Sequence, residues 1–424
     1  MSAFVVKDIK AREILSTGSF PTVEAEVILS NGISARASVP RGTSEGSKEP
    51  RFCLDGDENR YHGMGVLTAI ENIKKKILPA LKGMAVTDQE AIDKCLNELD
   101  GKKDKSNLGV NSILAVSLAC ARTASTAVGQ PLYQYLLKFF DRESVTQLPK
   151  PMAVVIEGGK HADNSTDFQE YMVLGLNENI PIAVRNCVEV YQELRKVLKE
   201  NEYDVNVGYE GAYAFTRAKS NEEALVFIEE AVERCKLEMG KEIALGMDPA
   251  ASEFFKKEDN RYHLSRQDEI LTSDELINFY KKLKEKHKGI ITLEDGLDEE
   301  DWTNWVKLCQ TLGDEVLIIG DDLTVTNSKL VKQAIKTNAI NGLLVKPNQA
   351  GTISETIKAI KTAKESGIKL VVSHRGGGET NDNFIVDLAV ACEASYIKCG
   401  VSRGERVSKY NYLMEIASNL TIHL

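Results

Sequence analysis

Hydrophobic and polar residues alternate along the first part of the chain, as they do in a strand with one buried face. The clearest case is Thr22–Leu29, and Asn31-Gly32 follows it as a two-residue hairpin signal. Helical periodicity replaces this alternation farther along the chain. We therefore predict an N-terminal α+β domain over residues 1–140, with strands first and helices afterwards. Its helices are expected over residues 66–81, 87–99 and 108–128.

A different pattern begins near Pro151, where short, continuous apolar runs alternate with amphipathic stretches. Continuous apolar runs are typical of parallel strands buried on both faces. Strands are expected over 152–156, 168–174, 205–209, 243–248, 289–295, 316–322, 342–348, 368–375 and 395–399, and helices over 182–200, 222–238, 273–287, 353–366 and 404–417. So many β/α alternations predict a (β/α)8-type barrel over residues 141–424. A doubly wound open sheet is the alternative, but the chain has no GxGxxG or GxxxxGK[ST] nucleotide motif.

Three pairs with the spacing of a capping box mark expected helix starts. They are Thr87 with Glu90, Thr272 with Glu275, and Thr352 with Glu355.

Composition narrows the possible partners and the compartment. The net charge of −10 argues against nucleic acid or an anionic membrane as the main partner. Eight cysteines without a CxxC pair predict reduced thiols rather than disulfides or a zinc site. The N-terminus has charges inside its apolar run, and the apolar stretch 108–129 is rich in Ala and Ser. We expect no signal peptide, no membrane span and a cytoplasmic protein.

Charged residues follow the predicted strands of the second region. They are Asp248, Glu294-Asp295, Asp321-Asp322, Lys346, His374-Arg375 and Lys398, and from Glu294 onward they recur at intervals of 24 to 28 residues. In a parallel barrel all these strand ends open onto one face, where barrel enzymes place their sites. Taken singly, an Asp such as Asp295, Asp298 or Asp322 would be a helix cap or a solvated loop residue.

The residue types indicate a hard-metal site beside a base. Carboxylates without His or Cys partners suit Mg²⁺ or Mn²⁺ rather than Zn²⁺. A lysine facing the metal and a second lysine can have a lowered pKa and serve as a base. Metal opposite a base is what removal of a proton next to a carboxylate requires, because the metal stabilises the enediolate.

Longer motifs resemble those of the enolase family over nearly the whole chain. The matching runs are 112–119, 158–164, 169–170, Asp248 with 252–255, 293–298, 320–327, 345–349, 373–375, 397–398 and 403–406. The VKPNQ and SRGERVSKYN forms are similar to those of archaeal members. The resemblance implies an N-terminal α+β domain, a barrel with the irregular start of that family, and a homodimer. It also implies reversible dehydration of 2-phosphoglycerate to phosphoenolpyruvate, as in glycolysis, with two Mg²⁺ per active site.

The resemblance also implies residue roles. Asp248, Glu294 and Asp321 would bind the first Mg²⁺, and Ser44 would join the second one and the substrate from a mobile loop. Lys346 would take the C2 proton. The remaining roles are protonation of the C3 hydroxyl by Glu210 with Glu170, contacts near the leaving group and phosphate by His374 and His161, and substrate binding by Arg375, Ser373, Lys398 and Gln169.

Some positions depart from the family pattern. Residues 16–21 replace DSRGNP, Glu157 replaces the Asn of NGG, and Tyr209 enters the motif of the acid. Arg41 and Glu45 flank the mobile loop, and three glycines follow Arg375. Two alternatives therefore stay open: an enolase-like enzyme acting on another carboxylate, and a non-catalytic binding protein.

Overall fold

The N-terminal region is an antiparallel sheet covered by helices. The computed structural model describes residues 4–42 and 46–420. Strands β1 (Val6–Leu15), β2 (Pro21–Leu29) and β3 (Ser34–Ser38) pair in the order β1-β2-β3. Val23, Ala25, Val27 and Leu29 are buried, so the alternation in β2 does mark one buried face. The amide of Gly32 donates to Leu29 in the turn that follows, which confirms the hairpin.

The helices of this region begin close to the expected positions. They are α1 (Leu67–Asn72), a π-helical turn (Ile73–Ile77), α2 (Leu78–Leu81), α3 (Gln89–Asp100), α4 (Val110–Ala127) and α5 (Leu132–Leu137). Helix α4 packs on β2 and β3 and is buried on nearly every side, which explains its small residues. The capping box at Thr87 is wrong, because Asp88 caps α3 by accepting from the amide of Ala91.

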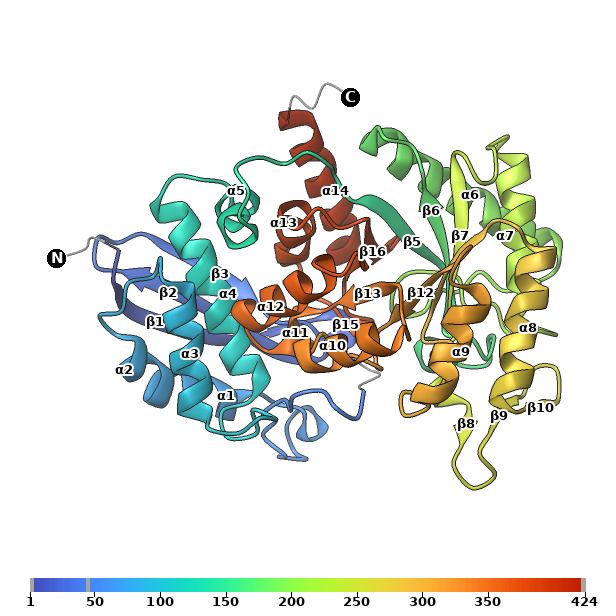
Figure 1. Cartoon of the computed structure of the whole chain (residues 1–424). Coiled ribbons are helices and arrows are strands. Elements are labelled where there is room, and N and C mark those ends of the chain that lie inside the picture. The colour runs from blue at the N-terminus through green and yellow to red at the C-terminus, as the bar shows by residue number, and fades with distance from the viewer. Residues whose placement is uncertain (1–3, 43–45, 421–424) are drawn as a thin grey trace.

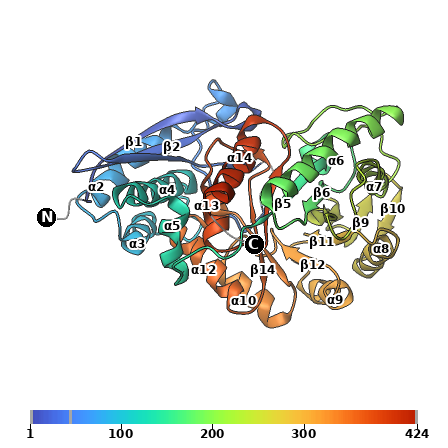
Figure 2. The same cartoon turned by 90° about the horizontal axis from the view of Figure 1, so that it is seen from above.

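A closed eight-stranded barrel forms the rest of the chain and confirms the predicted fold class (Figures 1 and 2). Its strands, in the order in which they pair, are β11 (Ile290–Glu294), β12 (Leu317–Gly320), β13 (Gly342–Val345), β14 (Lys369–Ser373), β16 (Tyr396–Gly400), β5 (Lys150–Glu157), β6 (Glu170–Gly175) and β7 (Ile243–Asp248). Two-residue strands β4 (Arg41–Gly42) and β15 (Gly377–Gly378) pair with each other, and β8 (Phe255–Lys256), β9 (Arg261–Leu264) and β10 (Glu269–Leu271) form a separate sheet.

Helices surround this barrel. They are α6 (Ile180–Glu200), α7 (Glu223–Arg234), α8 (Ser273–Lys286), α9 (Trp302–Leu312), α10 (Ser328–Thr337), α11 (Pro347–Ala350), α12 (Ile353–Lys364), α13 (Phe384–Ala391) and α14 (Gly404–Asn419). The capping box of Thr272 and Glu275 is present at α8. At α12, Thr352 accepts from the amide of Glu355 as expected.

Two expectations for the barrel strands are corrected. Strand β6 runs antiparallel to both β5 and β7, so the barrel is not wholly parallel. Residues 205–209 form no strand, and Val207 makes only an isolated bridge to Tyr213. The irregular start therefore consists of the β5–β6 hairpin followed by α6 and α7.

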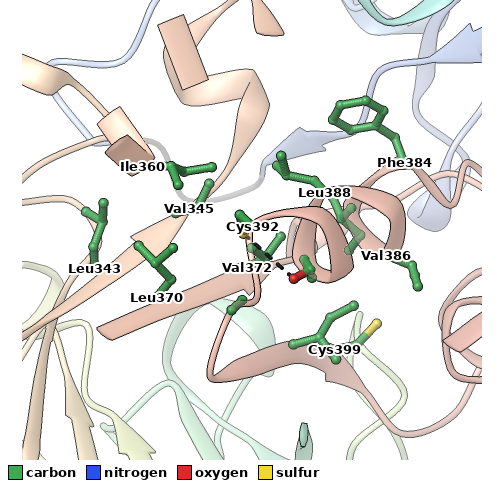
Figure 3. Packing of buried hydrophobic residues seen from close by; sticks show 14 of the residues in the cluster. Leu343, Val345, Ile360, Leu370, Val372, Phe384, Val386, Leu388, Cys392 and Cys399 are labelled. Atoms are coloured by element: carbon green, nitrogen blue, oxygen red, sulfur yellow. Dashed lines mark hydrogen bonds between the residues drawn. The ribbon is translucent and has the colours of Figure 1, made fainter. Parts of the chain in front are cut away.

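The core lies between the barrel strands and the helices outside them. Figure 3 shows Leu343, Val345, Leu370 and Val372 of β13 and β14 facing Ile360 of α12, with Leu388 of α13 beside them. Along the strands, every second side chain points inward, and these side chains fill the barrel interior. Among them are Met152, Val154, Met172 and Ile319. Among the described helices, none alone has the length and apolarity of a membrane span, and only α4 with 132–140 passes as a pair bent by 106°.

Candidate active site at the barrel mouth

The carboxyl ends of the parallel strands bring the charged side chains together. Asp248 and Glu294 are the last residues of β7 and β11, and Asp321 and Lys346 directly follow β12 and β13. His374-Arg375 follows β14, and Lys398 lies within β16. All of these side chains are nearly or fully buried.

The reversed direction of β6 adds a carboxylate to this mouth. Glu170 is the first residue of β6 and pairs with Glu157 at the end of β5 and with Asp248 at the end of β7. In a parallel strand the first residue would lie at the opposite end of the barrel. Glu170 therefore depends on the antiparallel hairpin for its place in the site.

Lys398 is the central cation of one half of the mouth. Its Nζ lies 2.7 Å from Glu170 Oε2, 3.1 Å from Asp248 Oδ2 and 2.7 Å from Glu294 Oε2. Burial lowers the pKa of Lys398, but these carboxylates raise it well above its ordinary value. The pKa of Glu294 is raised by burial and by the charge of Asp248. The cluster therefore holds excess negative charge beside one ammonium group.

Lys346 is paired with the third predicted metal ligand. Its Nζ contacts Asp321, and Gln349 donates to Asp321 Oδ1 at 2.8 Å. Burial, Arg375 and Lys398 lower the pKa of Lys346, but Asp321 and Glu294 raise it by more, so the net shift is upward. A cation bound to Asp321 would weaken the interaction that holds the proton on this lysine.

A second group in the mouth places one buried glutamate between two histidines. Glu210 is fully buried, with Oε1 3.3 Å from His161 Nδ1 and Oε2 3.2 Å from His374 Nε2. His161 Nδ1 also lies 3.3 Å from Glu170 Oε1. Burial raises the pKa of Glu210, but His374 and His161 hold it well below its ordinary value. Burial lowers the pKa of His374, yet Glu210 raises it to about 9, so this pair retains a proton at neutral pH.

Arg375 joins the mouth to the segment around the predicted mobile loop. Its Nη2 lies 2.8 Å from Glu49 Oε1, and its guanidinium covers Gly42, where a Cβ would come within 2.3 Å of it. Strands β4 and β15 pair Gly42 with Gly377 at the same place. The glycines after Arg375 thus contact the base of the loop. Ser44 itself lies outside the described residues.

The two remaining predicted substrate contacts are buried near the mouth. Ser373, at the end of β14, donates its hydroxyl to the carbonyl of His374 at 2.9 Å. Gln169 directly precedes β6 and is 5% exposed. Ser373 also lines a small cavity with His374 and Arg375.

The predicted metal ligands suit a divalent cation, although the side chains are turned toward the lysines. Glu294 Oε1 is buried and has no hydrogen-bond partner among the described residues, so this oxygen remains available. Oxygen-only donors with surplus negative charge fit Mg²⁺. Across residues 4–42 and 46–420, two other groups have ligand atoms within 4.8 Å of one another: Asp295, Asp321 and Asp322, and His161, Glu170 and Glu210. In the second group, Lys398 and His374 already neutralise the two glutamates.

The sequence analysis assigned no role in the site to three residues that organise it. Asp295 is buried and accepts from the amides of Asp321 and Asp322, both at 2.9 Å, so it is neither a cap nor a solvated loop residue. Gln349 bridges Asp321 and Glu49. Only its place after Lys346, in a motif shared with the family, signalled Gln349, and nothing in the pattern signalled Glu49.

Family models match both parts of the chain. The model described as "Enolase, N-terminal domain" matches residues 6–136. The model described as "Enolase, C-terminal TIM barrel domain" matches residues 145–423. These matches confirm the resemblance of the motifs and agree with the barrel and the sheet-and-helix region described above. The chain belongs to the enolase family.

Proposed function

We propose that the protein catalyses the Mg²⁺-dependent, reversible dehydration of 2-phosphoglycerate to phosphoenolpyruvate, a step of glycolysis. The observation that carries this proposal is the pairing of Lys346 with the carboxylate Asp321 in the same mouth as the Glu210–His374 proton pair. Such a dehydration needs a base for one proton, a donor for the leaving hydroxyl and charge stabilisation for the intermediate.

The residues divide this work. Bound Mg²⁺, held by Asp248, Glu294 and Asp321 with Ser44 at the second ion, would stabilise the negative charge that develops on the substrate carboxylate. Lys346 takes the proton from C2. The substrate's C3 hydroxyl departs with a proton that Glu210 delivers from His374, since His374 holds the proton of this pair at neutral pH.

The other side chains bind and orient the substrate. Arg375 presents a buried guanidinium for the phosphate, and Ser373 lines the same cavity. His161 is proposed to lie near the leaving group and the phosphate. Lys398 and Gln169 lie near the substrate carboxylate, and Glu170 assists Glu210. Burial of these groups excludes water, which strengthens each charge interaction.

Formation of phosphoenolpyruvate from 2-phosphoglycerate, followed by ultraviolet absorbance with and without Mg²⁺, tests this function. We expect turnover that requires the metal and disappears in Lys346→Ala. The control is Lys336→Ala on the exposed face of α10, which should retain wild-type activity. Absence of turnover at every Mg²⁺ concentration would reject the proposal. Turnover of another hydroxy acid that depends on Lys346 would instead support an enolase-like enzyme for that acid.

We further propose a cytoplasmic homodimer, because the family membership and the absence of CxxC pairs in the sequence support it. Light scattering coupled to size-exclusion chromatography tests the dimer, and a monomeric mass at micromolar concentration would count against it.

A further inference from the structure

Glu157, the last residue of β5, directs its carboxylate at the turn that carries Glu210. It is fully buried. Its Oε1 accepts from the backbone amides of Glu210 at 3.0 Å and of Ala212 at 2.8 Å, and its Oε2 lies 3.1 Å from the same Glu210 amide. The turn of residues 208–212 belongs to no helix or regular strand, so its buried amides lack the partners that a helix or sheet would give. The amides of Gly208 and Gly211 donate to carbonyls within the turn, and Glu157 accepts from those of Glu210 and Ala212.

The carbonyl groups of the turn are held from the opposite direction. Gly208 O accepts from Arg403 Nη2 at 2.8 Å, and Gly211 O accepts from Ser402 Oγ at 2.6 Å and from Tyr191 at 2.7 Å. The segment after β16 and helix α6 therefore fix the carbonyls. Among the described residues, the side chain that accepts from the amides of Glu210 and Ala212 is that of Glu157.

The carboxylate also lies in direct contact with the turn. A Cβ at Gly208 would come within 2.4 Å of Glu157 Oε2 and 2.8 Å of the carbonyl of His161. A residue with a side chain at 208 would push Glu157 away from the Glu210 amide. The absence of a side chain at Gly208 therefore leaves room for the Glu157 carboxylate beside the turn.

Glu157 also contributes charge to the proton-handling group. The ionisable groups that face it are Glu210 from the turn, His161 from the segment after β5, and Glu170 from the paired strand β6. Burial and the charge of Glu210 raise the pKa of Glu157 to about 8, whereas His161 lowers it. Glu157 is in turn one of the carboxylates that raise the pKa of His161. An asparagine, the residue of the family motif at this position, would carry no charge.

We infer that Glu157 is a positioning residue for the proposed dehydration: it anchors the turn that presents Glu210 and places a second acidic group behind the Glu210–His161 pair. The inference rests on the proposed function, and one of its tests does not require turnover. Two substitutions separate the anchor from the charge. Glu157→Gln keeps an oxygen that accepts from both amides and removes the charge, whereas Glu157→Leu removes both.

The kinetic test compares pH profiles of kcat and KM for the two variants. Glu157→Leu should lower kcat by about 100-fold with KM little changed, because Glu210 moves while the substrate contacts stay. Glu157→Gln should retain nearly wild-type kcat at pH 7, where Glu157 is protonated. Above pH 8 the wild-type carboxyl ionises and helps to retain the proton on His161, so the alkaline limb of Glu157→Gln should lie at lower pH.

The matched control is Glu193→Gln on α6, a carboxylate that pairs with Lys196 away from the mouth. Its pH profile should equal that of the wild type. Wild-type kcat in Glu157→Leu would overturn the anchor, and an unchanged alkaline limb in Glu157→Gln would overturn the effect of the charge. Circular dichroism of Glu157→Leu must show native folding. If Glu157→Leu does not fold, Glu157→Asn replaces it, because the shorter Asn side chain cannot reach both amides. A higher kcat in Glu157→Gln than in Glu157→Asn would then support the anchoring role, and equal values would overturn it.

A second readout is the proton titration of His161 by NMR, with its signal assigned by its loss in His161→Asn. In Glu157→Gln the alkaline part of the titration should shift to lower pH, since above about pH 8 the wild-type carboxylate places beside His161 a negative charge that the amide lacks. An identical titration in both proteins would overturn the inference. If wild-type protein did not turn over 2-phosphoglycerate, the proposed function would fail, while this titration would still decide the charge effect of Glu157.

Discussion

Lys398 is the central counter-ion of the barrel mouth. Its ammonium group lies within 3.1 Å of three carboxylates, and the side chain is 2% exposed. A buried charge that loses its partner destabilises a protein strongly, since the desolvation cost is no longer offset. Lys398 neutralises Asp248 and Glu294, and a divalent cation at the proposed site would do the same, so each would reduce the need for the other in the folded protein.

Lys398→Met tests this relation. Without Mg²⁺ we expect the free energy of unfolding to fall by about 3–5 kcal/mol, because three buried carboxylates lose their counter-ion. Mg²⁺ should then stabilise the variant more than the wild type in urea denaturation. Lys336→Met on α10 serves as the exposed control. A loss below about 1 kcal/mol would show that the cluster does not need this cation.

If Asp321 binds Mg²⁺ as proposed, the metal should raise the melting temperature of the wild type, and Asp321→Asn should abolish that rise. The amide removes one anionic ligand, and it also leaves Lys346 without its partner. For that reason the measured quantity is the difference between melting curves with and without metal. Asp314→Asn, at an exposed position before β12, is the matched control. An undiminished shift in Asp321→Asn would exclude Asp321 as a ligand.

The sequence allowed the strand-end residues to be predicted, whereas their supporting contacts needed the structure. Asp248, Glu294 and Lys346 follow apolar runs, and strand ends of a parallel barrel share one face. Glu49 lies in a segment without helix or strand, and only the course of that segment in the fold brings its carboxylate to Arg375. No periodicity specifies such a path, so its partners cannot be derived from local pattern.

Among the elements, the short β4–β15 pair connects the loop region with the residues after Arg375. Gly42 allows the guanidinium to pass directly over the backbone, where a Cβ would come within 2.3 Å of Arg375. Gly42 pairs with Gly377 and Arg41 with Gly378. The departures from the family pattern at 41 and at 376–378 are thus neighbours in space.

Gly42→Ala should raise KM for the proposed substrate 2-phosphoglycerate by about tenfold and lower kcat less, because the methyl group displaces the Arg375 guanidinium that we propose binds the phosphate. Gly404→Ala is the control, since a Cβ there has no neighbour within 4 Å. Steady-state kinetics on both variants provide the measurement. An equal loss of kcat with constant KM would indicate that Arg375 acts in the chemical step instead.

Helix α3 offers a test of the corrected cap. Asp88→Ala should lower the free energy of unfolding by about 1 kcal/mol, since the amide of Ala91 loses its acceptor. Thr87→Ala should change it by less than about 0.5 kcal/mol. Chemical denaturation of the two variants gives the comparison, and the reverse order would restore Thr87 as the cap.

Periodicity predicted most elements and could not predict strand direction. The run at 171–174 is apolar on both faces whichever way the strand runs, so the pattern held no signature of the antiparallel direction of β6. The run at 205–209 has the pattern of a strand, yet in the structure Val207 forms only an isolated bridge, to Tyr213. The direction of β6 and the lack of a strand at 205–209 both depend on which segments pair, and those segments lie far apart in the sequence.

On the scale of the whole molecule, buried polar contacts join the N-terminal helices to the barrel helices. Asp93 of α3 accepts from the amide and hydroxyl of Ser354 on α12. Arg122 of α4 makes paired contacts with Asp382. Figures 1 and 2 both show α3 and α4 beside α12. The division into domains at residues 140 and 141 stays a prediction.

Asp387 makes this junction sensitive to pH. It accepts from the amide of Tyr133 on α5 and from the hydroxyl of Tyr412 on α14, and burial raises its pKa to about 7. The folded protein therefore keeps this proton between about pH 4 and 7, where the unfolded chain has lost it. Its contribution to stability is complete below pH 4 and decreases as the pH rises to 7.

Asp387→Asn removes that titration while keeping an oxygen for both donors. Relative to the wild type, the variant should gain up to about 1.4 kcal/mol of stability for each pH unit between 4 and 7. Urea denaturation at several pH values measures the difference. Parallel stability curves for the two proteins would contradict the raised pKa.

The pairing of β5 with β16 has a consequence for biosynthesis. Strand β5 is the first barrel strand to leave the ribosome and β16 is the last, yet the two pair directly. The edge of β5 stays exposed throughout translation of the barrel, and exposed strand edges promote aggregation. Nascent chains truncated before residue 396 should therefore require chaperones, and the barrel should close only after release of the complete chain.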